Sequence, residues 1–282
     1  MKGKRILETA GLILGILVLY AVVLVSCENK IIYHPHKFPA GEWDAADDSA
    51  LKVEEVWFRA ADGVKLHAWY FPSSNARATV LFFHGNAGNL THRVQNIEQL
   101  TPLGLNVFIF DYRGYGKSEG SPHEEGILKD SQAAYDTLVK VRKVPPEKLI
   151  LFGRSLGGAF AADVAFKNPA AGLILESAFT DASDMAWKVF PILPLGWAIS
   201  SRLDAVNKVP HIAIPKLFFH GTRDEVVPYK LGRKLYEAAA EPKQWYDIPG
   251  AGHNDTWYVG GQLYFERIDR FVGEALNQPS QG

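Results

Sequence analysis

The chain has 282 residues, of which 30 are lysine or arginine and 31 are aspartate or glutamate, so its formal net charge is -1 at pH 7. This balanced charge, without a basic patch rich in aromatic residues, argues against nucleic acid as a partner. The length suits one large α/β domain or two small ones. The single cysteine, Cys27, excludes an intrachain disulfide and a cysteine-based zinc site.

The N-terminus has the composition of a membrane-targeting segment. Three basic residues within the first five positions precede a nearly unbroken apolar run over residues 10–25. A helix of about sixteen to twenty apolar residues can cross a bilayer, and basic residues before it place the N-terminus in the cytoplasm. We therefore expect residues 1–28 to attach the protein to a membrane, with residues 29–282 forming a domain on the extracytoplasmic face.

Three forms of this segment are open. It can be an uncleaved signal anchor, a cleaved signal peptide, or the leader of a bacterial lipoprotein. The lipoprotein reading rests on Leu24-Val25-Ser26-Cys27, which has the form of a lipobox and contains the chain's one cysteine. Two of the three forms leave the domain tethered to the membrane, and in the lipoprotein the tether is Cys27.

Residues 29–48 contain prolines but no periodicity and predict a linker that packs on the domain. After it, apolar stretches alternate with helical ones, and the first two strands form a hairpin. The predicted strands cover residues 53–59, 65–71, 78–83, 107–110, 149–152, 173–175, 216–219 and 244–248. The predicted helices cover residues 91–103, 124–142, 159–166, 229–239 and 263–276, with Asp130 and Asp136 on the polar face of the second. This order predicts an eight-stranded, mostly parallel sheet flanked by helices.

The alternation breaks at about residues 178–210, which predict a short helical cap inserted after a strand. The segment is rich in large apolar side chains, and two more aromatic residues follow soon after residue 253. They are Phe179, Met185, Trp187, Phe190, Leu193, Trp197, Trp257 and Tyr258. Such residues either form the buried face of cap helices or line a pocket for an apolar acyl chain. The second reading predicts that Trp187 and Trp197 contribute to preference for longer acyl groups.

A strand, a sharp turn and a helix meet at Gly153-Arg154-Ser155-Leu156-Gly157. A G-x-S-x-G sequence in this context is typical of a nucleophile elbow, in which a strained turn lifts the serine hydroxyl above the sheet. Side chains at either glycine should collide with the neighbouring strand and helix. The pattern therefore predicts Ser155 as a nucleophile.

A serine nucleophile needs a base, and the base needs an acid. His253 is the predicted base, because it lies in a loop of small residues straight after the last strand. His84 and His220 each precede a glycine at a strand end and are expected to brace loops, and the other six histidines carry no motif. Asp224 is the predicted acid, since it follows the penultimate strand. Its nearest rivals are Glu225 and, more remotely, Glu176.

The tetrahedral intermediate of acyl transfer needs two backbone donors for its oxyanion. The N–H of Leu156 is one candidate, because it lies at the start of a helix directly after the nucleophile. The N–H of Asn86 is the other, since it lies in the glycine-rich loop after residues 78–83. This set of residues requires no metal ion and no organic cofactor.

Five segments together resemble one known family. They are His84-Gly-Asn-Ala-Gly-Asn89, Asp111-Tyr-Arg-Gly-Tyr-Gly116, Gly153-Arg-Ser-Leu-Gly-Gly158, His220-Gly-x-x-Asp224 and Gly252-His253. The chain from about residue 29 onward is similar to the Bem-type (bud-emergence-suppressor-like) serine hydrolases, which include α/β-hydrolase-domain proteins with one N-terminal membrane segment. The resemblance implies the α/β-hydrolase fold and a Ser155, Asp224, His253 triad, and some of these relatives are depalmitoylases or lipases.

These observations predict a membrane-tethered serine hydrolase that cleaves carboxylic esters or thioesters, with a small acyl or lipid-derived substrate. A serine peptidase of the same fold is the enzymatic alternative. A scaffold without catalytic activity is a remote alternative, because no member of the triad is missing.

Overall fold

The computed structural model describes residues 2–45, 51–189 and 199–277 of the chain. These residues form one eight-stranded sheet in the spatial order β1-β2-β4-β3-β5-β6-β7-β8. The strands are β1 Glu54–Arg59, β2 Lys65–Phe71, β3 Ala78–Phe83, β4 Leu105–Phe110, β5 Leu149–Arg154, β6 Gly172–Glu176, β7 Lys216–Gly221 and β8 Lys243–Ile248. β2 pairs antiparallel with β1 and β4, and every other pairing is parallel. The predicted mixed, mostly parallel sheet is therefore confirmed.

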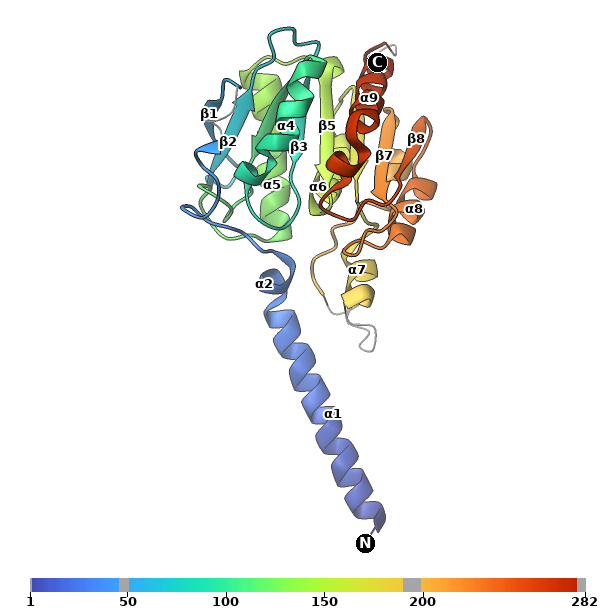
Figure 1. Ribbon diagram of the computed structural model, residues 1–282. Coiled ribbons are helices and arrows are strands. Elements are labelled where there is room, and N and C mark those ends of the chain that lie inside the picture. The colour runs from blue at the N-terminus through green and yellow to red at the C-terminus, as the bar shows by residue number, and fades with distance from the viewer. Residues whose placement is uncertain (1, 46–50, 190–198, 278–282) are drawn as a thin grey trace.

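Helices cover both faces of this sheet, α4 and α9 on one face and α5 and α6 on the other (Figure 1). The helices are α1 Lys2–Ser26, α2 Glu28–Ile32, α4 Val94–Leu100, α5 Glu124–Asp136, α6 Leu156–Lys167, α7 Ala182–Val189, α8 Tyr229–Ala238 and α9 Thr256–Leu276. Short 3₁₀ turns flank α4 on both sides, and a π turn, Thr137–Val141, extends α5. The helix predicted over residues 263–276 begins earlier and contains one non-helical residue, Gly261, with φ 52°.

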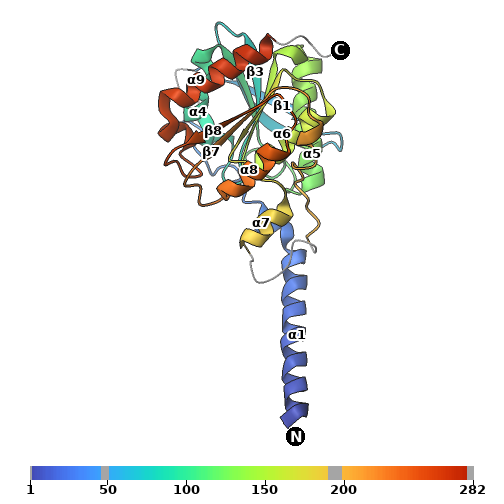
Figure 2. The same ribbon diagram turned by 90° about the vertical axis from the view of Figure 1, so that its right-hand side faces the viewer.

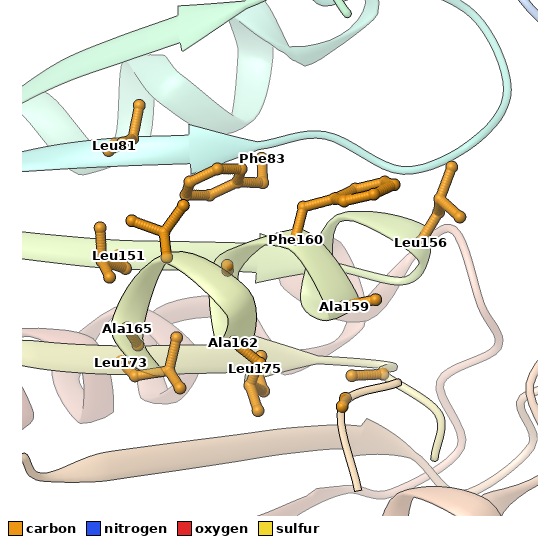
Figure 3. Close-up of a cluster of buried hydrophobic side chains, with 14 of the residues drawn as sticks. Leu81, Phe83, Leu151, Leu156, Ala159, Phe160, Ala162, Ala165, Leu173 and Leu175 are labelled. Carbon is orange, nitrogen blue, oxygen red and sulfur yellow. The ribbon is translucent and has the colours of Figure 1, made fainter. Parts of the chain in front are cut away.

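The core consists of two apolar clusters, one on each face of the sheet. Successive side chains of β3 alternate between them: Leu81 and Phe83 join the cluster under α6, whereas Val80 and Phe82 join the cluster under α4 and α9. This alternation is the period of two that a strand imposes. Figure 3 shows α6 lying against β3, β5 and β6, with Phe160 directed toward β3. Burial on both faces explains why the central strands are continuous apolar runs.

One expectation for α5 was wrong. Asp130 lies on the buried face of this helix, with no solvent exposure, and accepts a hydrogen bond of 2.7 Å from Arg113 Nη2. Arg113 also donates to Asp62, so the loop after β4 is tied to α5 and to the turn between β1 and β2. A carboxylate can be buried when a guanidinium pairs with it. The helical pattern alone could not reveal that partner.

The N-terminal helix α1 extends away from the domain, from the end of the sheet where α2 and α7 lie (Figures 1 and 2). No helix in the described ranges combines the length and hydropathy needed to cross a bilayer. The predicted transmembrane anchor therefore gains no support from the described helices. Within the predicted cap, α7 is helical as expected, and Phe190, Leu193 and Trp197 lie outside the described residues.

Candidate active site

Ser155 occupies the turn between β5 and α6, as the sequence predicts. Its backbone is strained, with φ 53° and ψ -121°. A Cβ added to Gly157 would lie 2.1 Å from the carbonyl oxygen of Phe83, and one on Gly153 would lie 2.6 Å from the carbonyl oxygen of Gly157. The expected collisions with a strand and a helix are thus confirmed. Glycine at both positions lets α6 approach the sheet closely enough to make the turn.

The structure brings Ser155, His253 and Asp224 together, although they are up to 98 positions apart in the chain. His253 Nε2 lies 3.0 Å from Ser155 Oγ, and His253 Nδ1 lies 2.8 Å from Asp224 Oδ2. Because an ionised carboxylate can only accept, Nδ1 carries the proton and Nε2 is free to accept the serine proton. Ser155 and His253 are each 7% exposed, so these hydrogen bonds are largely shielded from solvent. Both residues nevertheless line a cavity, from which a substrate can reach them.

The loop after β7 holds Asp224 in place. Its Oδ1 accepts hydrogen bonds from the backbone N–H groups of Val226 (3.0 Å) and Val227 (2.8 Å). Burial alone would raise the pKa of Asp224, but the hydrogen bond and charge of His253 and the Val227 amide outweigh it, so the pKa lies below its ordinary value. His220 Nε2 lies 3.1 Å from the carbonyl oxygen of Val227, so this histidine braces the loop, as expected.

The two rival carboxylates lie elsewhere. Glu225 is exposed, and its Oε2 accepts a long hydrogen bond of 3.3 Å from the backbone N–H of His253 rather than from the imidazole. Glu176 is fully buried at the end of β6 and accepts hydrogen bonds from Thr256, Tyr264 and Arg154. Neither reaches the ring of His253, and Asp224 is the carboxylate that does.

Arg154 and Glu176 form a buried support for the histidine loop that sequence reasoning missed. Arg154 Nε donates to Glu176 Oε1 at 3.0 Å, and its Nη2 donates to the carbonyl oxygen of His253 at 2.6 Å. The same nitrogen donates to Asn254 Oδ1 at 3.2 Å. Since Arg154 is the neighbour of Ser155, one side chain fixes the distance between the serine turn and the histidine loop. Its place in the G-x-S-x-G motif was the available signal.

Replacing Glu176 with glutamine should destabilise the domain by about 3 kcal/mol, because it leaves the Arg154 guanidinium buried without its counterion. Urea unfolding measures this change. The kcat should fall as well, because Arg154 would no longer be held by a carboxylate and would position the carbonyl of His253 less firmly. Glu147→Gln, on an exposed turn, is the control and should leave both values unchanged. An unfolding midpoint for Glu176→Gln equal to that of the wild type would contradict this role.

The two expected oxyanion donors belong to the segments that directly follow β3 and β5. Leu156 is the first residue of α6, where the helix dipole favours negative charge. Asn86 follows β3, and its side chain accepts from Tyr115 Oη at 2.9 Å and donates to the carbonyl oxygen of Ile32. Neither backbone N–H has an acceptor among the described residues. Both are therefore available to a substrate oxygen.

A cavity of about 430 Å³ opens beside Ser155. Its lining is mainly apolar and includes Phe179, Met185 and Leu203, and Arg93 also lines it. Burial lowers the pKa of Arg93 to about 10, and the side chain donates to the carbonyl oxygen of Ala87. The cavity thus has an apolar wall and a cationic border next to the nucleophile.

Of the residues that could have lined an acyl pocket, Phe179 and Met185 do line this cavity, whereas Trp187 does not. Its side chain is 51% exposed on α7, whereas Met185 and Ala186 of the same helix face the cavity. Trp257 and Tyr258 lie at the start of α9 and do not line it either, and Tyr258 is 76% exposed. One turn of an amphipathic helix presents neighbouring residues to different sides, so composition alone could not choose between them.

No group of three or more histidine, cysteine, aspartate or glutamate side chains among the described residues could hold a metal ion.

Comparison with known proteins gives consistent results. Residues 74–202 match the family model described as serine aminopeptidase, S33. The α/β-hydrolase domain-containing protein WAV2 of Arabidopsis thaliana is 36% identical over 282 residues, which cover 92% of this chain and 91% of WAV2. Protein bem46 of Schizosaccharomyces pombe is 33% identical, with 98% and 96% covered, and YfhR of Escherichia coli is 37% identical, with 80% and 82% covered.

Solved structures share the fold at lower identity. An esterase of Pyrococcus furiosus superposes with a TM-score of 0.71 at 22% identity, covering 86% of this chain and 98% of the esterase. An esterase of Exiguobacterium antarcticum gives a TM-score of 0.60 at 19% identity, covering 78% and 100%. The predicted α/β-hydrolase fold is confirmed.

Proposed function

Since the chain belongs to the α/β-hydrolase family that includes bem46 and WAV2, we propose that it is a serine hydrolase that cleaves carboxylic esters or thioesters. The observation that carries this proposal is the continuous pair of hydrogen bonds that links Ser155 Oγ through the His253 imidazole to Asp224. A scaffold without activity would have no need for both hydrogen bonds and the strained serine turn, so we do not favour that alternative.

The reaction begins when Ser155 Oγ attacks the acyl carbon and its proton passes to His253 Nε2. Asp224 stabilises the imidazolium through Nδ1, and the N–H groups of Asn86 and Leu156 bind the oxyanion. The imidazolium then gives its proton to the departing alkoxide or thiolate, which leaves an acyl-enzyme. Water, deprotonated by His253, attacks the acyl carbon and restores the serine hydroxyl. The proton transfer between Ser155 and His253 and the support of the imidazolium by Asp224 use groups that already lie within hydrogen-bonding distance of each other.

The apolar lining favours a substrate with a hydrocarbon acyl group. It also weighs against an aminopeptidase, the activity in the family description, because such an enzyme has to bind a substrate ammonium group. Among the described residues that line the cavity, the carboxylate is Glu28, and it already accepts hydrogen bonds from Ser200 and Ser201. Arg93 and Arg154 would repel a cation.

A series of p-nitrophenyl esters tests this proposal. We expect kcat/KM to rise from the acetyl ester to about the hexanoyl or octanoyl ester and then to level off, as each buried methylene contributes about 0.8 kcal/mol until the cavity is filled. Aminoacyl p-nitroanilides serve as the comparison. Activity that is greatest on acetyl esters and falls with each added carbon would refute an acyl pocket, and cleavage of the anilides without the esters would favour the peptidase.

We also propose that the protein is attached to a membrane through its N-terminus, with the catalytic domain on the extracytoplasmic face. Exposed apolar side chains on α1 support this proposal: Leu12, Ile16 and Leu19 are 66%, 57% and 64% exposed, and contact with an apolar phase would remove them from water. The three forms of the segment remain open, and they differ in what happens at Cys27.

Membrane fractionation after a Cys27→Ser change separates these forms. The wild type should sediment with membranes, and its domain should be degraded by protease added from the outer face. Cys27→Ser should release or mislocalise a lipoprotein but leave a signal anchor in the membrane. A soluble wild-type protein with an intact α1, or a domain protected from external protease, would contradict the attachment.

A further inference from the structure

The N-terminal segment forms part of the cavity beside Ser155. Leu24 at the end of α1 and Ile31 and Ile32 of α2 line it, together with residues such as Met185 and Leu203. These two groups of residues come from regions about 150 positions or more apart in the chain. The segment predicted to be an anchor and linker thus contributes one wall of the active-site cavity.

This wall is fixed to the chain that returns from the cap. Glu28 is 5% exposed, and its carboxylate accepts hydrogen bonds from Ser200 N (2.8 Å), Ser200 Oγ (2.9 Å) and Ser201 N (2.6 Å). Glu124 of α5 accepts from the next two backbone amides, those of Arg202 and Leu203. Although burial opposes ionisation, the hydrogen bonds from Ser201 and Ser200 outweigh it and lower the pKa of Glu28. Two carboxylates therefore hold four consecutive amides at the cavity border.

The same segment is fixed to the loop that carries Asn86. His34 N donates to Asn86 Oδ1 at 3.0 Å, and His36 N donates to the carbonyl oxygen of Gly88 at 3.1 Å. Asn86 Nδ2 donates in return to the carbonyl oxygen of Ile32. The wall is thus positioned from two sides, by the cap and by the loop after β3, and its apolar side chains have a defined place relative to Ser155.

We propose that the side chains of Leu24, Ile31 and Ile32 form the wall that selects the length of the substrate's acyl chain. This inference rests on the proposed ester or thioester hydrolysis at Ser155. The acyl carbon lies at Ser155 Oγ, and the hydrocarbon chain extends between the N-terminal segment and α7 toward the end of α1. Short acyl groups do not reach this wall, whereas chains of about six to eight carbons pack against it.

Ile31 is the position to test, because Ile32 also packs on the core and its replacement would disturb the fold. In full-length protein reconstituted in phospholipid nanodiscs, Ile31→Ala should lower kcat/KM for the octanoyl ester about five- to tenfold and for the acetyl ester less than twofold. Ile31→Trp, which fills the cavity, should lower the octanoyl value by more than tenfold and retain acetyl hydrolysis. Lys30→Ala, an exposed neighbour on α2, is the control and should match the wild type for both esters.

Two kinetic outcomes overturn the assignment. If the acetyl and octanoyl values fall by the same factor in both variants, the segment acts only on the geometry around Ser155. If neither variant changes either value, the acyl chain does not contact this wall. Labelling by a small fluorophosphonate at the wild-type rate shows that the variants are folded with an intact serine.

A binding measurement separates this inference from the proposed function. Fluorescence anisotropy of a fluorescent dodecanoic acid, corrected for empty nanodiscs, should show binding to the wild type and to Lys30→Ala. Ile31→Trp should weaken it at least tenfold. If the wild type binds this acid, Ile31→Trp binds it at least tenfold more weakly and no ester is cleaved, the acyl-chain wall is supported but ester hydrolysis is refuted. Equal binding by Ile31→Trp and the wild type would refute the wall.

Discussion

Ser155→Ala should lower kcat/KM for ester substrates by about 10⁴- to 10⁶-fold, to the residual rate that binding and the oxyanion donors sustain. The substitution removes the one oxygen that His253 Nε2 contacts at 3.0 Å. It should not impair folding, because the turn is held by backbone contacts, including the bond from Ser155 N to the carbonyl oxygen of Glu176 at 2.8 Å. Loss of activity with an unchanged unfolding curve is the expected result.

Labelling by a fluorophosphonate gives the same result independently of substrate choice. The wild type should be labelled and Ser155→Ala should not. Ser131→Ala is a matched control, since Ser131 is buried in α5 and its hydroxyl has no hydrogen-bond partner among the described residues. Undiminished labelling of Ser155→Ala would locate the nucleophile at another residue.

The sequence was sufficient to predict the sheet because its central strands are short, continuous apolar runs bounded by glycine-rich loops. Residues 78–83 and 149–154 are buried along their whole length, and such runs separated by helices favour a parallel sheet. The residues of the candidate site follow from the same order. Ser155, Asp224 and His253 each come directly after a strand or in the loop that follows it, and in a parallel sheet these positions meet at one edge.

Contacts between distant parts of the chain could not be predicted in this way. The carboxylate of Glu28 binds amides 172 and 173 positions away, and no local pattern in residues 24–32 points to the cap. Asp130 was expected on a polar face for the same reason: its partner, Arg113, lies in another loop. Hydrophobic periodicity reports which residues are apolar, but not which buried charge has a counterion.

Amino-acid composition also could not predict which apolar residues of the cap line the cavity. The large apolar residues after residue 178 predicted either a buried cap face or an acyl pocket. Phe179 and Met185 do line the cavity, together with residues of the N-terminal segment, whereas Trp187 is exposed. Side-chain size alone favoured Trp187, the largest side chain in α7, as a pocket residue. Which side of α7 faces the cavity depends on how the helix packs on the rest of the domain, which is a property of the tertiary structure.

Asp224→Asn should lower kcat by about 10⁴-fold while leaving the fold intact. The asparagine amide can donate to His253 Nδ1, which favours the tautomer with its proton on Nε2. That nitrogen could then no longer accept the proton of Ser155, 3.0 Å away. The effect should therefore appear in kcat more than in KM, and the rate of fluorophosphonate labelling should fall in parallel.

Glu225→Gln is the matched control for this substitution, because it alters the neighbouring carboxylate in the same way. Glu225 is exposed, and among the described residues its side chain accepts a hydrogen bond from the backbone N–H of His253 alone, at 3.3 Å, which a glutamine oxygen could accept as well. We expect its kcat to stay within about threefold of the wild type, as for a weak surface contact. If Glu225→Gln instead caused the large loss and Asp224→Asn the small one, the acid would be Glu225. The 2.8 Å contact between His253 Nδ1 and Asp224 would then have to be replaced by a different arrangement of the loop during turnover.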